Sequence, residues 1–313
     1  MELRDLTDDY AERATRARPE CRAAPGGPVR AAVLQQRYRL AMPGTGPVEQ
    51  PDRAIREALA RSAAGGACGF FFDFDGTLSP IGPDPEAVQP VPGVIDQLGK
   101  LAMLAGKVGI ISARPVSFLA SRFGDARGLS LYGLYGLEAI RDGVTSTDPE
   151  AERWMATIQQ VRELATNELP PDVYIEDKRL AVAFHYRQHP ERQAEAEAWA
   201  NAKAREYGLA EQPGRMVIEL KPPISTDKGT VLRAEIGSLR SIWYFGDDVA
   251  DAEGFEALRS QQERDPGFFG VCVAVANNEV GHALTDRADF SLASPAAMPA
   301  FLAAAIEQFS AAG

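Results

Sequence analysis

The chain has 313 residues, of which 45% are hydrophobic and 25% are charged, close to the averages for globular proteins. This composition excludes the disordered, collagen-like and membrane classes, and no apolar run approaches the length of a membrane span. The net charge of -11 argues against a nucleic-acid ligand, because phosphate contacts require a basic surface. The cysteines, Cys21, Cys68 and Cys272, are too widely spaced for a disulfide framework or a zinc site, so we expect a cytoplasmic protein.

Residues 1–65 are rich in Ala, Arg, Pro and Gly, and helix-breaking residues cluster at 24–28 and 42–47. Short helices are expected at 9–16 and 52–61. Because the stretch has little sustained periodicity, we interpret it as an N-terminal extension, mobile or partly helical, without an assigned role.

Four short apolar runs follow, and each ends at polar residues, as a buried parallel strand does where it enters a loop. They occupy residues 70–74, 108–111, 242–245 and 271–275. Helical periodicity separates several of them, most clearly where Val94, Leu98 and Leu101 line one face. The pattern predicts an α/β core with a parallel sheet, formed by residues 66–147 and 222–313.

Residues 148–221 have a different pattern, which reads as helix, two strands, helix and strand. Asp148 and Pro149 form a good helix start. A hairpin is expected to turn near Asp177 and Lys178, and a later strand is expected over 215–220. In that strand Glu219 would point away from the apolar residues on either side. We therefore expect an α+β unit inserted into the α/β core.

Two carboxylates, Asp73 and Asp75, follow the first apolar run directly, where open α/β sheets place their ligands. One can attack phosphorus to give an aspartyl phosphate, while the other protonates the departing alcohol and then activates water. Thr77 could hydrogen-bond the phosphoryl oxygens. A calcium-type loop or a plain strand-end turn would explain D-x-D alone, but D-x-D-G-T after a buried strand favours phosphoryl transfer.

Three more side chains suit the same chemistry. Ser112 ends the second apolar run and could donate to a phosphoryl group, and Arg114 could reach phosphate or a substrate hydroxyl. Lys228 could neutralise both the phosphate and the attacking carboxylate. Taken alone, Ser112 is better explained as a helix cap and Lys228 as a solvated lysine.

A second group of acids follows the apolar run 242–245 and comprises Asp247, Asp248 and Asp251. Magnesium prefers oxygen ligands and keeps several waters, so Asp73, one or two of these carboxylates and a backbone carbonyl would suffice. We expect Mg²⁺ at Asp73, Asp75, Asp247 and Asp248. An acidic first turn of a helix is the simpler explanation for Asp251.

These motifs, in this order, are the signature of the haloacid-dehalogenase superfamily, which the chain resembles throughout residues 69–305. Six segments further resemble the trehalose-6-phosphate phosphatases. They are 72–81 (FDFDGTLSPI), 135–138 (YGLE), 175–187 (IEDKRLAVAFHYR), 217–222 (VIELKP), 227–229 (DKG) and 246–255 (GDDVADAEGF). The resemblance implies a Rossmann-like core with an α/β cap, a phosphorylated disaccharide substrate, Mg²⁺, and a functional link to a trehalose-phosphate synthase.

The resemblance also assigns roles by position. It implies Asp73 as nucleophile, Asp75 as acid and base, and Ser112 and Lys228 as phosphate ligands. It further implies that charged residues at motif positions grip the sugar, namely Glu138, Glu176, Lys178 and Glu219.

The chain departs from the family pattern at Ala113, where glycine is common, and at Tyr135, where histidine is common. The second departure leaves pseudo-disaccharide phosphates related to trehalose phosphate open as substrates. Another sugar phosphate, such as sucrose phosphate, and a catalytically silent ligand-binding domain remain the alternatives.

Overall fold

The computed structural model describes residues 49–312, except 83, 125, 215 and 277–283. The helix expected at 9–16 lies outside these residues. Within the described part of the chain, no helix has both the length and the apolar character needed to cross a bilayer.

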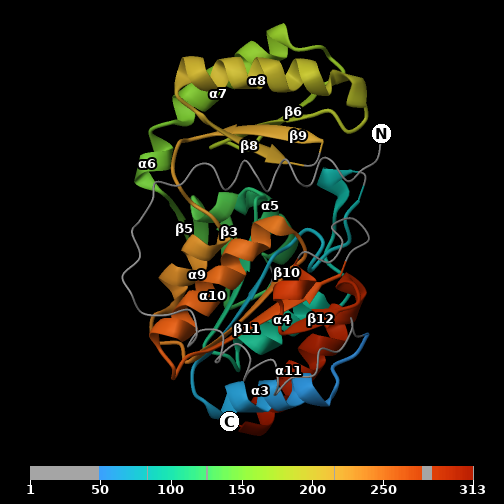
Figure 1. Ribbon diagram of the computed structural model, residues 1–313, viewed down its shortest axis with the longest axis vertical. Coiled ribbons are helices and arrows are strands. Elements are labelled where there is room, and N and C mark those ends of the chain that lie inside the picture. Colours follow the sequence, from blue (N-terminus) through green and yellow to red (C-terminus); the bar gives the residue numbers. More distant parts are fainter. Residues whose placement is uncertain (1–48, 83, 125, 215, 277–283, 313) are drawn as a thin grey trace, which may run out of the picture. The chain divides into compact units, whose positions relative to one another are not determined.

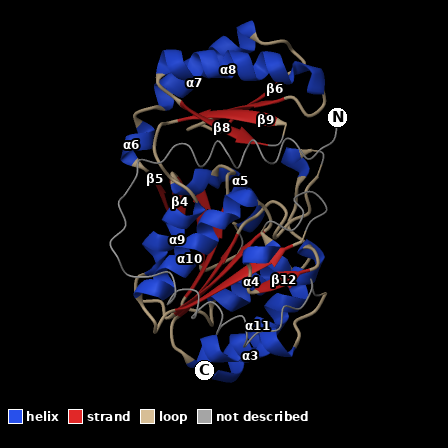
Figure 2. Cartoon of the chain, in the orientation of Figure 1, coloured by secondary structure: helices blue, strands red, loops and turns tan. Residues whose placement is uncertain are grey.

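An eight-stranded sheet forms the core, with strand order β12-β11-β10-β1-β2-β3-β4-β5. Figure 2 draws the strands in red and the helices around them in blue. The strands from β12 to β3 pair in parallel, whereas β3, β4 and β5 pair antiparallel at one edge. In chain order they are β1 (Cys68–Phe72), β2 (Lys107–Ile111), β3 (Leu129–Gly133), β4 (Glu138–Arg141), β5 (Val144–Thr147), β10 (Ser241–Gly246), β11 (Phe269–Val275) and β12 (Phe290–Leu292).

Helices cover both faces of this sheet, as buried parallel strands require. On one face α9 and α10 pack against Tyr244, Phe71 and neighbouring apolar residues. On the other, α11 packs against both α3 and α4 (Figure 1). The helices are α3 (Arg53–Ala64), α4 (Val94–Ala102), α5 (Val116–Phe123), α9 (Lys228–Ile236), α10 (Ala252–Arg264) and α11 (Met298–Ala312).

Helix α3 falls in the stretch interpreted as an extension, yet its inner face is part of the packed core. Asp52 caps it by accepting a hydrogen bond from the backbone N–H of Ile55, and Ile55 and Leu59 are buried. The indole of Trp243 on β10 donates a hydrogen bond of 2.9 Å to the hydroxyl of Ser62. The helix therefore ties residues 53–64 to the central sheet.

A second sheet, of four antiparallel strands, lies within residues 148–221, which we call the cap segment. Its order is β6-β7-β9-β8, and α7 and α8 cover one of its faces (Figure 1). The elements are α6 (Pro149–Glu152), α7 (Met155–Glu168), β6 (Tyr174–Asp177), β7 (Val182–His185), α8 (Gln193–Tyr207), β8 (Ala210–Gly214) and β9 (Val217–Lys221). The predicted parallel α/β core with a separate α+β unit is confirmed.

Strand alternation gives the cap sheet two different faces. Val182, Phe184, Ile218 and Leu220 pack against the two helices and are buried. The residues between them face the other way, and register places Ala183 opposite both Glu176 and Glu219. As the sequence pattern predicted, Glu219 lies opposite the apolar face.

Short helical turns connect several elements. They are η1 (Pro85–Ala87), η2 (Leu134–Gly136), η3 (Pro190–Arg192), η4 (Val249–Asp251), η5 (Thr285–Arg287) and η6 (Pro295–Ala297).

Candidate active site

The neighbouring strands β1 and β10 place Asp73 and Asp247 at one edge of the core sheet. β1 and β10 run parallel with Phe72 opposite Phe245, and the chain continues from them into Asp73 and Asp247. The backbone N–H of Asp73 extends the ladder by donating to the carbonyl of Phe245 at 2.9 Å. Parallel pairing therefore brings together carboxylates that are 174 positions apart.

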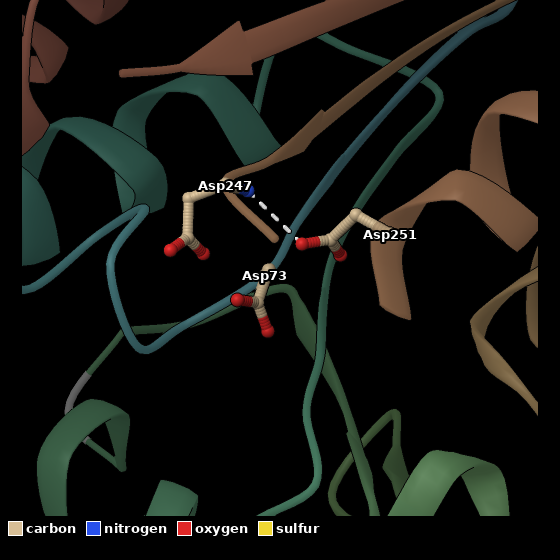
Figure 3. Close-up of side chains that lie close together, drawn as sticks. All are labelled: Asp73, Asp247 and Asp251. Atoms are coloured by element: carbon tan, nitrogen blue, oxygen red, sulfur yellow. Dashed lines mark hydrogen bonds between the residues drawn. The ribbon is translucent and has the colours of Figure 1, made fainter. Parts of the chain in front are cut away.

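Asp73, Asp247 and Asp251 form a buried acidic cluster (Figure 3). One carboxylate oxygen from each residue lies within 4.8 Å of the others. Such a spacing lets a single cation contact more than one of them, because divalent metals bind carboxylate oxygens at about 2.0–2.6 Å. Asp248 lies at the start of η4, where it accepts the N–H of Ala250 at 2.8 Å.

Asp251 holds this cluster in place. One of its oxygens accepts the backbone N–H groups of Asp247 and Asp248, at 3.0 and 3.2 Å. The other accepts the amine of Lys228, at 2.6 Å, and the hydroxyl of Tyr244. With four donors on its two oxygens, Asp251 is suited to anchoring the loop that carries Asp247.

Lys228 is the cation of the cluster. Its amine lies 2.7 Å from Oδ1 of Asp73 and is almost completely buried. Burial opposes the charged amine, but Asp251 and Asp73 raise the pKa of Lys228 well above its ordinary value. The amine is therefore held in its charged form beside the predicted nucleophile.

The acids outnumber this single buried amine. Burial raises the pKa of Asp73 well above its ordinary value, although Lys228 opposes the shift. Burial, together with the charges of Asp251 and Asp248, raises the pKa of Asp247 to about 8. The cluster therefore holds more buried carboxyl groups than one amine can neutralise, and a divalent cation would offset their negative charge when they ionise.

The D-x-D-G-T loop fits tightly around Asp247. Gly76 has φ +81°, and a Cβ at this position would lie 2.1 Å from Oδ2 of Asp247. Glycine is thus required both for the backbone conformation and for space. The hydroxyl of Thr77, a predicted phosphate ligand, is fully buried and donates to Oδ1 of Asp247 at 3.4 Å.

Asp75 and Arg114 form a bidentate ion pair. Nε and Nη2 of Arg114 each donate to one oxygen of Asp75, both at 2.9 Å. Ser112 lies in the same turn and accepts the backbone N–H of Arg114 at 3.1 Å, so its hydroxyl positions this turn. The pair links the D-x-D loop to the loop after β2.

The cap residues expected to grip the sugar form a separate network. The amine of Lys178 lies 2.5 Å from Glu219 and 3.9 Å from Glu176, and all three are buried. His185 lies 2.7 Å from Glu176. The three predicted cap residues are therefore assembled on one side of the cap sheet, with their charges paired.

Glu138, the fourth predicted sugar residue, takes part in other contacts. It starts β4 in the core sheet and accepts hydrogen bonds from the backbone N–H of Val116 and from Arg179. Tyr135, in the turn before it, has φ +58°, and its ring centroid lies 5.0 Å from the amine of Lys221. No local sequence pattern marks Arg179, Lys221 or Tyr244, because their contacts with Glu138, Tyr135 and Asp251 depend on long-range pairing.

Comparison with known proteins decides the family. The model of the trehalose-phosphatase family matches residues 71–295. The chain belongs to the trehalose-phosphatase family. The resemblance drawn from the sequence motifs is confirmed.

Members of this family from mycobacteria are similar along most of the chain. The trehalose-phosphate phosphatase of Mycobacterium avium is 35% identical over 238 residues, which cover 72% of this chain and 59% of that protein. The trehalose-phosphate phosphatase of Mycobacterium marinum is 35% identical over 254 residues, which cover 78% and 62%. The chain thus spans about three fifths of the length of these relatives.

Solved structures of the trehalose-phosphatase family share the fold. A protein related to trehalose-6-phosphate phosphatase superposes with a TM-score of 0.61 and 24% identity, over 75% of this chain and 95% of that one. The C-terminal domain of the Candida albicans trehalose-6-phosphate phosphatase gives a TM-score of 0.62 and 22% identity, over 86% and 98%.

Proposed function

We propose that this chain hydrolyses the phosphate ester of trehalose 6-phosphate, or of a close trehalose-like disaccharide, to the free sugar and phosphate. The observation that carries the proposal is the contact between Asp73 and Lys228, at 2.7 Å, inside a buried acidic cluster. A carboxylate next to a fixed cation suits attack on phosphorus, because the cation also attracts the phosphate. Membership of the family supports the sugar assignment.

We propose Mg²⁺ as the cofactor, held by Asp73 and Asp247 with Asp75 and Asp248 in support. The excess of buried carboxylates over buried amines fits a divalent cation with oxygen ligands. When bound, Mg²⁺ supplies positive charge that stabilises the transferring phosphoryl group.

The chain's own residues would carry out two displacements. Asp73 attacks phosphorus and forms an aspartyl phosphate, while Asp75 donates a proton to the departing sugar oxygen. Asp75 then takes a proton from water, which attacks phosphorus and releases phosphate and the Asp73 carboxylate. Ser112, Thr77 and Lys228 would bind the phosphoryl oxygens.

This role for Asp75 requires its pair with Arg114 to open, because both of its oxygens accept from the guanidinium. Arginine also binds phosphate and hydroxyl oxygens, so an incoming substrate competes with Asp75 for the same donors. We propose that substrate binding moves Arg114 to the substrate and frees Asp75 for proton transfer.

The cap network supports selectivity for a sugar. Glu176, Lys178 and Glu219 have their charged groups on one side of the cap sheet, where sugar hydroxyls could replace part of their mutual pairing.

We also propose that the protein works in the reducing cytosol and that a trehalose-phosphate synthase supplies its substrate. The buried free thiols of Cys68 and Cys272 fit the first.

A phosphate-release assay tests the proposed function. Trehalose 6-phosphate, sucrose 6-phosphate, glucose 6-phosphate and a cyclitol-containing analogue would each be assayed with Mg²⁺ or EDTA. We expect Mg²⁺-dependent release from the trehalose-type substrate, with a loss of about a thousandfold or more in Asp73→Asn. Asp265→Asn, at the C-terminal end of α10, serves as the control. Absence of release from every substrate would instead support a silent ligand-binding domain, and equal rates for all would contradict selection by the cap.

A further inference from the structure

Glu138 makes two contacts that join distant parts of the chain. Its side chain is 5% exposed, and Oε2 accepts the backbone N–H of Val116 at 3.0 Å. Oε1 accepts from Nη1 of Arg179 at 2.8 Å. Both carboxylate oxygens thus accept from protein donors. One donor lies at the start of α5, and the other lies in the cap segment.

The contact with Val116 fixes the start of α5. Pro115 occupies the N-cap position of this helix, and its side chain makes no hydrogen bond to the first turn. Glu138 supplies the missing acceptor and places a negative charge at the positive end of the helix. The turn between β2 and α5 carries Ser112 and Arg114, so Glu138 also helps to position these two residues.

The close fit of β3 against this turn leaves it little freedom. A Cβ at Gly133 would lie 2.3 Å from the backbone nitrogen of Val116 and 2.8 Å from the carbonyl oxygen of Arg114. Leu134 also donates its backbone N–H to the carbonyl of Arg114, at 2.9 Å. A displacement of Glu138 would therefore be transmitted to the turn.

The contact with Arg179 fixes the tip of the cap hairpin. Arg179 has φ +68° in the turn between β6 and β7, next to Lys178. Its guanidinium also lies 3.2 Å from the hydroxyl of Thr147 on β5. Leu180, the following residue, is buried against Leu134 and Leu137, which lie at the two ends of η2. The tip that carries Lys178 is thus held by both an ion pair and apolar packing.

We propose that Glu138 is a positioning residue, which fixes the cap hairpin carrying Lys178 relative to the turn carrying Arg114. This inference rests on the proposed function and replaces a direct grip of Glu138 on the sugar. Both oxygens of Glu138 face protein donors and its side chain is only 5% exposed, so little of the carboxylate is open to sugar hydroxyls. It also keeps its buried charge compensated only while Arg179 stays in place.

Kinetics with two substrates test the proposal. Arg179→Ala and Glu138→Gln should each raise KM for the disaccharide phosphate by about fivefold to tenfold, with a smaller change in kcat. Turnover of p-nitrophenyl phosphate, which has no second sugar for the cap to hold, should stay within about twofold of the parent in Arg179→Ala, which leaves the bond between Glu138 and Val116 in place. The double variant should be no worse than either single variant, because both remove the same contact. Arg179→Lys should recover part of the loss.

Arg162→Ala is the matched control. Arg162 pairs with Asp177 of the same hairpin at 2.7 Å, but wholly within the cap segment, and its exposure is comparable to that of Arg179. It should leave KM unchanged. If Glu138→Gln impairs disaccharide turnover while Arg179→Ala does not, Glu138 contacts the sugar directly and the proposal is overturned.

A measurement without substrate separates this proposal from the proposed function. Amide hydrogen exchange of β6 and β7 should be faster in both Glu138→Gln and Arg179→Ala than in the parent, with equal circular dichroism spectra as the test of folding. Unchanged exchange in both variants would overturn the positioning role, whatever the chain hydrolyses. Faster exchange in a chain without phosphatase activity would support the positioning role while refuting the activity.

Discussion

Tyr244 donates its hydroxyl to the same oxygen of Asp251 that accepts from Lys228. Tyr244 lies inside β10 and is fully buried, and a Cβ on Gly254 of α10 would lie 2.3 Å from its ring. Tyr244 thus connects the packed core to the acidic cluster through the hydrogen bond of its hydroxyl to Asp251. It holds Asp251 at the oxygen that Lys228 also contacts.

Tyr244→Phe should lower stability by about 1–2 kcal/mol, because it leaves a buried acceptor with one donor fewer. It should also lower kcat severalfold, since Asp251 would hold Lys228 less firmly. Chemical unfolding and phosphate-release kinetics measure the two effects. Tyr186→Phe is the control, because the hydroxyl of Tyr186 donates to Glu197 in the cap segment. It should change stability alone, and an equal loss of kcat in both variants would contradict the role of Tyr244.

Gly76→Ala should abolish the stabilisation of the protein by Mg²⁺. The new methyl group would overlap the carboxylate of Asp247, in addition to straining a left-handed backbone. Gly93→Ala separates the two effects, because Gly93 has φ +86° but open space around its Cβ position. Thermal unfolding with and without MgCl₂ should show a Mg²⁺ shift in Gly93→Ala and none in Gly76→Ala. A normal shift in Gly76→Ala would show that Asp247 is not needed for the metal.

The affinity for Mg²⁺ should rise with pH between 6 and 8. Asp247 has its pKa raised to about 8 by burial and by neighbouring carboxylates, so Mg²⁺ must displace a proton below that pH. One displaced proton weakens binding about tenfold per pH unit. Calorimetric titrations at pH 6, 7 and 8 measure this, and affinity independent of pH would contradict the assignment.

The metal-free protein should respond in the opposite direction. The raised pKa means that folded Asp247 binds its proton more tightly than the unfolded carboxyl, whose ordinary value is 3.8. This contribution to stability is complete below the unfolded pKa and is lost as the pH rises through about 8. In EDTA, the free energy of unfolding should therefore fall between pH 6 and pH 8.5, and in MgCl₂ the fall should be smaller.

Lys228→Met should destabilise the protein by about 3 kcal/mol or more, because it leaves Asp73 and Asp251 buried without their cation. Lys178→Met is a matched change, since Lys178 is similarly buried and paired with Glu219 and Glu176. Denaturant unfolding should show a loss in both variants. Turnover of p-nitrophenyl phosphate should disappear only in Lys228→Met, and its survival there would contradict the proposed phosphate contact.

The sequence predicted the elements whose residues carry a strong local pattern. The apolar runs that became β1, β2, β10 and β11 are fully or almost fully buried, so their sequence is continuous and easily recognised. It did not predict β3, β12, the hairpin β4–β5 or β8. Strand β5 is largely exposed, and β8 is a sheet-edge strand that contains Pro213 and Gly214, so neither has an apolar run or a clear alternation.

For the candidate site, the sequence predicted which residues would occur at strand ends but not how they would pair. The Asp75 and Arg114 ion pair joins positions 39 apart, and the pair of Arg179 with Glu138 joins positions 41 apart. Such pairs depend on strand order and side-chain rotamers, which no local pattern encodes. Glu138 accordingly matched a motif position, while its partners became visible only in three dimensions.

The alternation of the cap sheet has a consequence for how substrate choice can change. Glu176 and Glu219 occupy the face opposite Ile218 and Leu220, so exchanging the acids need not disturb the apolar layer beneath them. The acids near Asp73 belong to another sheet altogether. A lineage, or a directed-evolution library confined to these cap positions, could therefore come to accept a new sugar while the residues proposed for phosphoryl transfer stay unchanged.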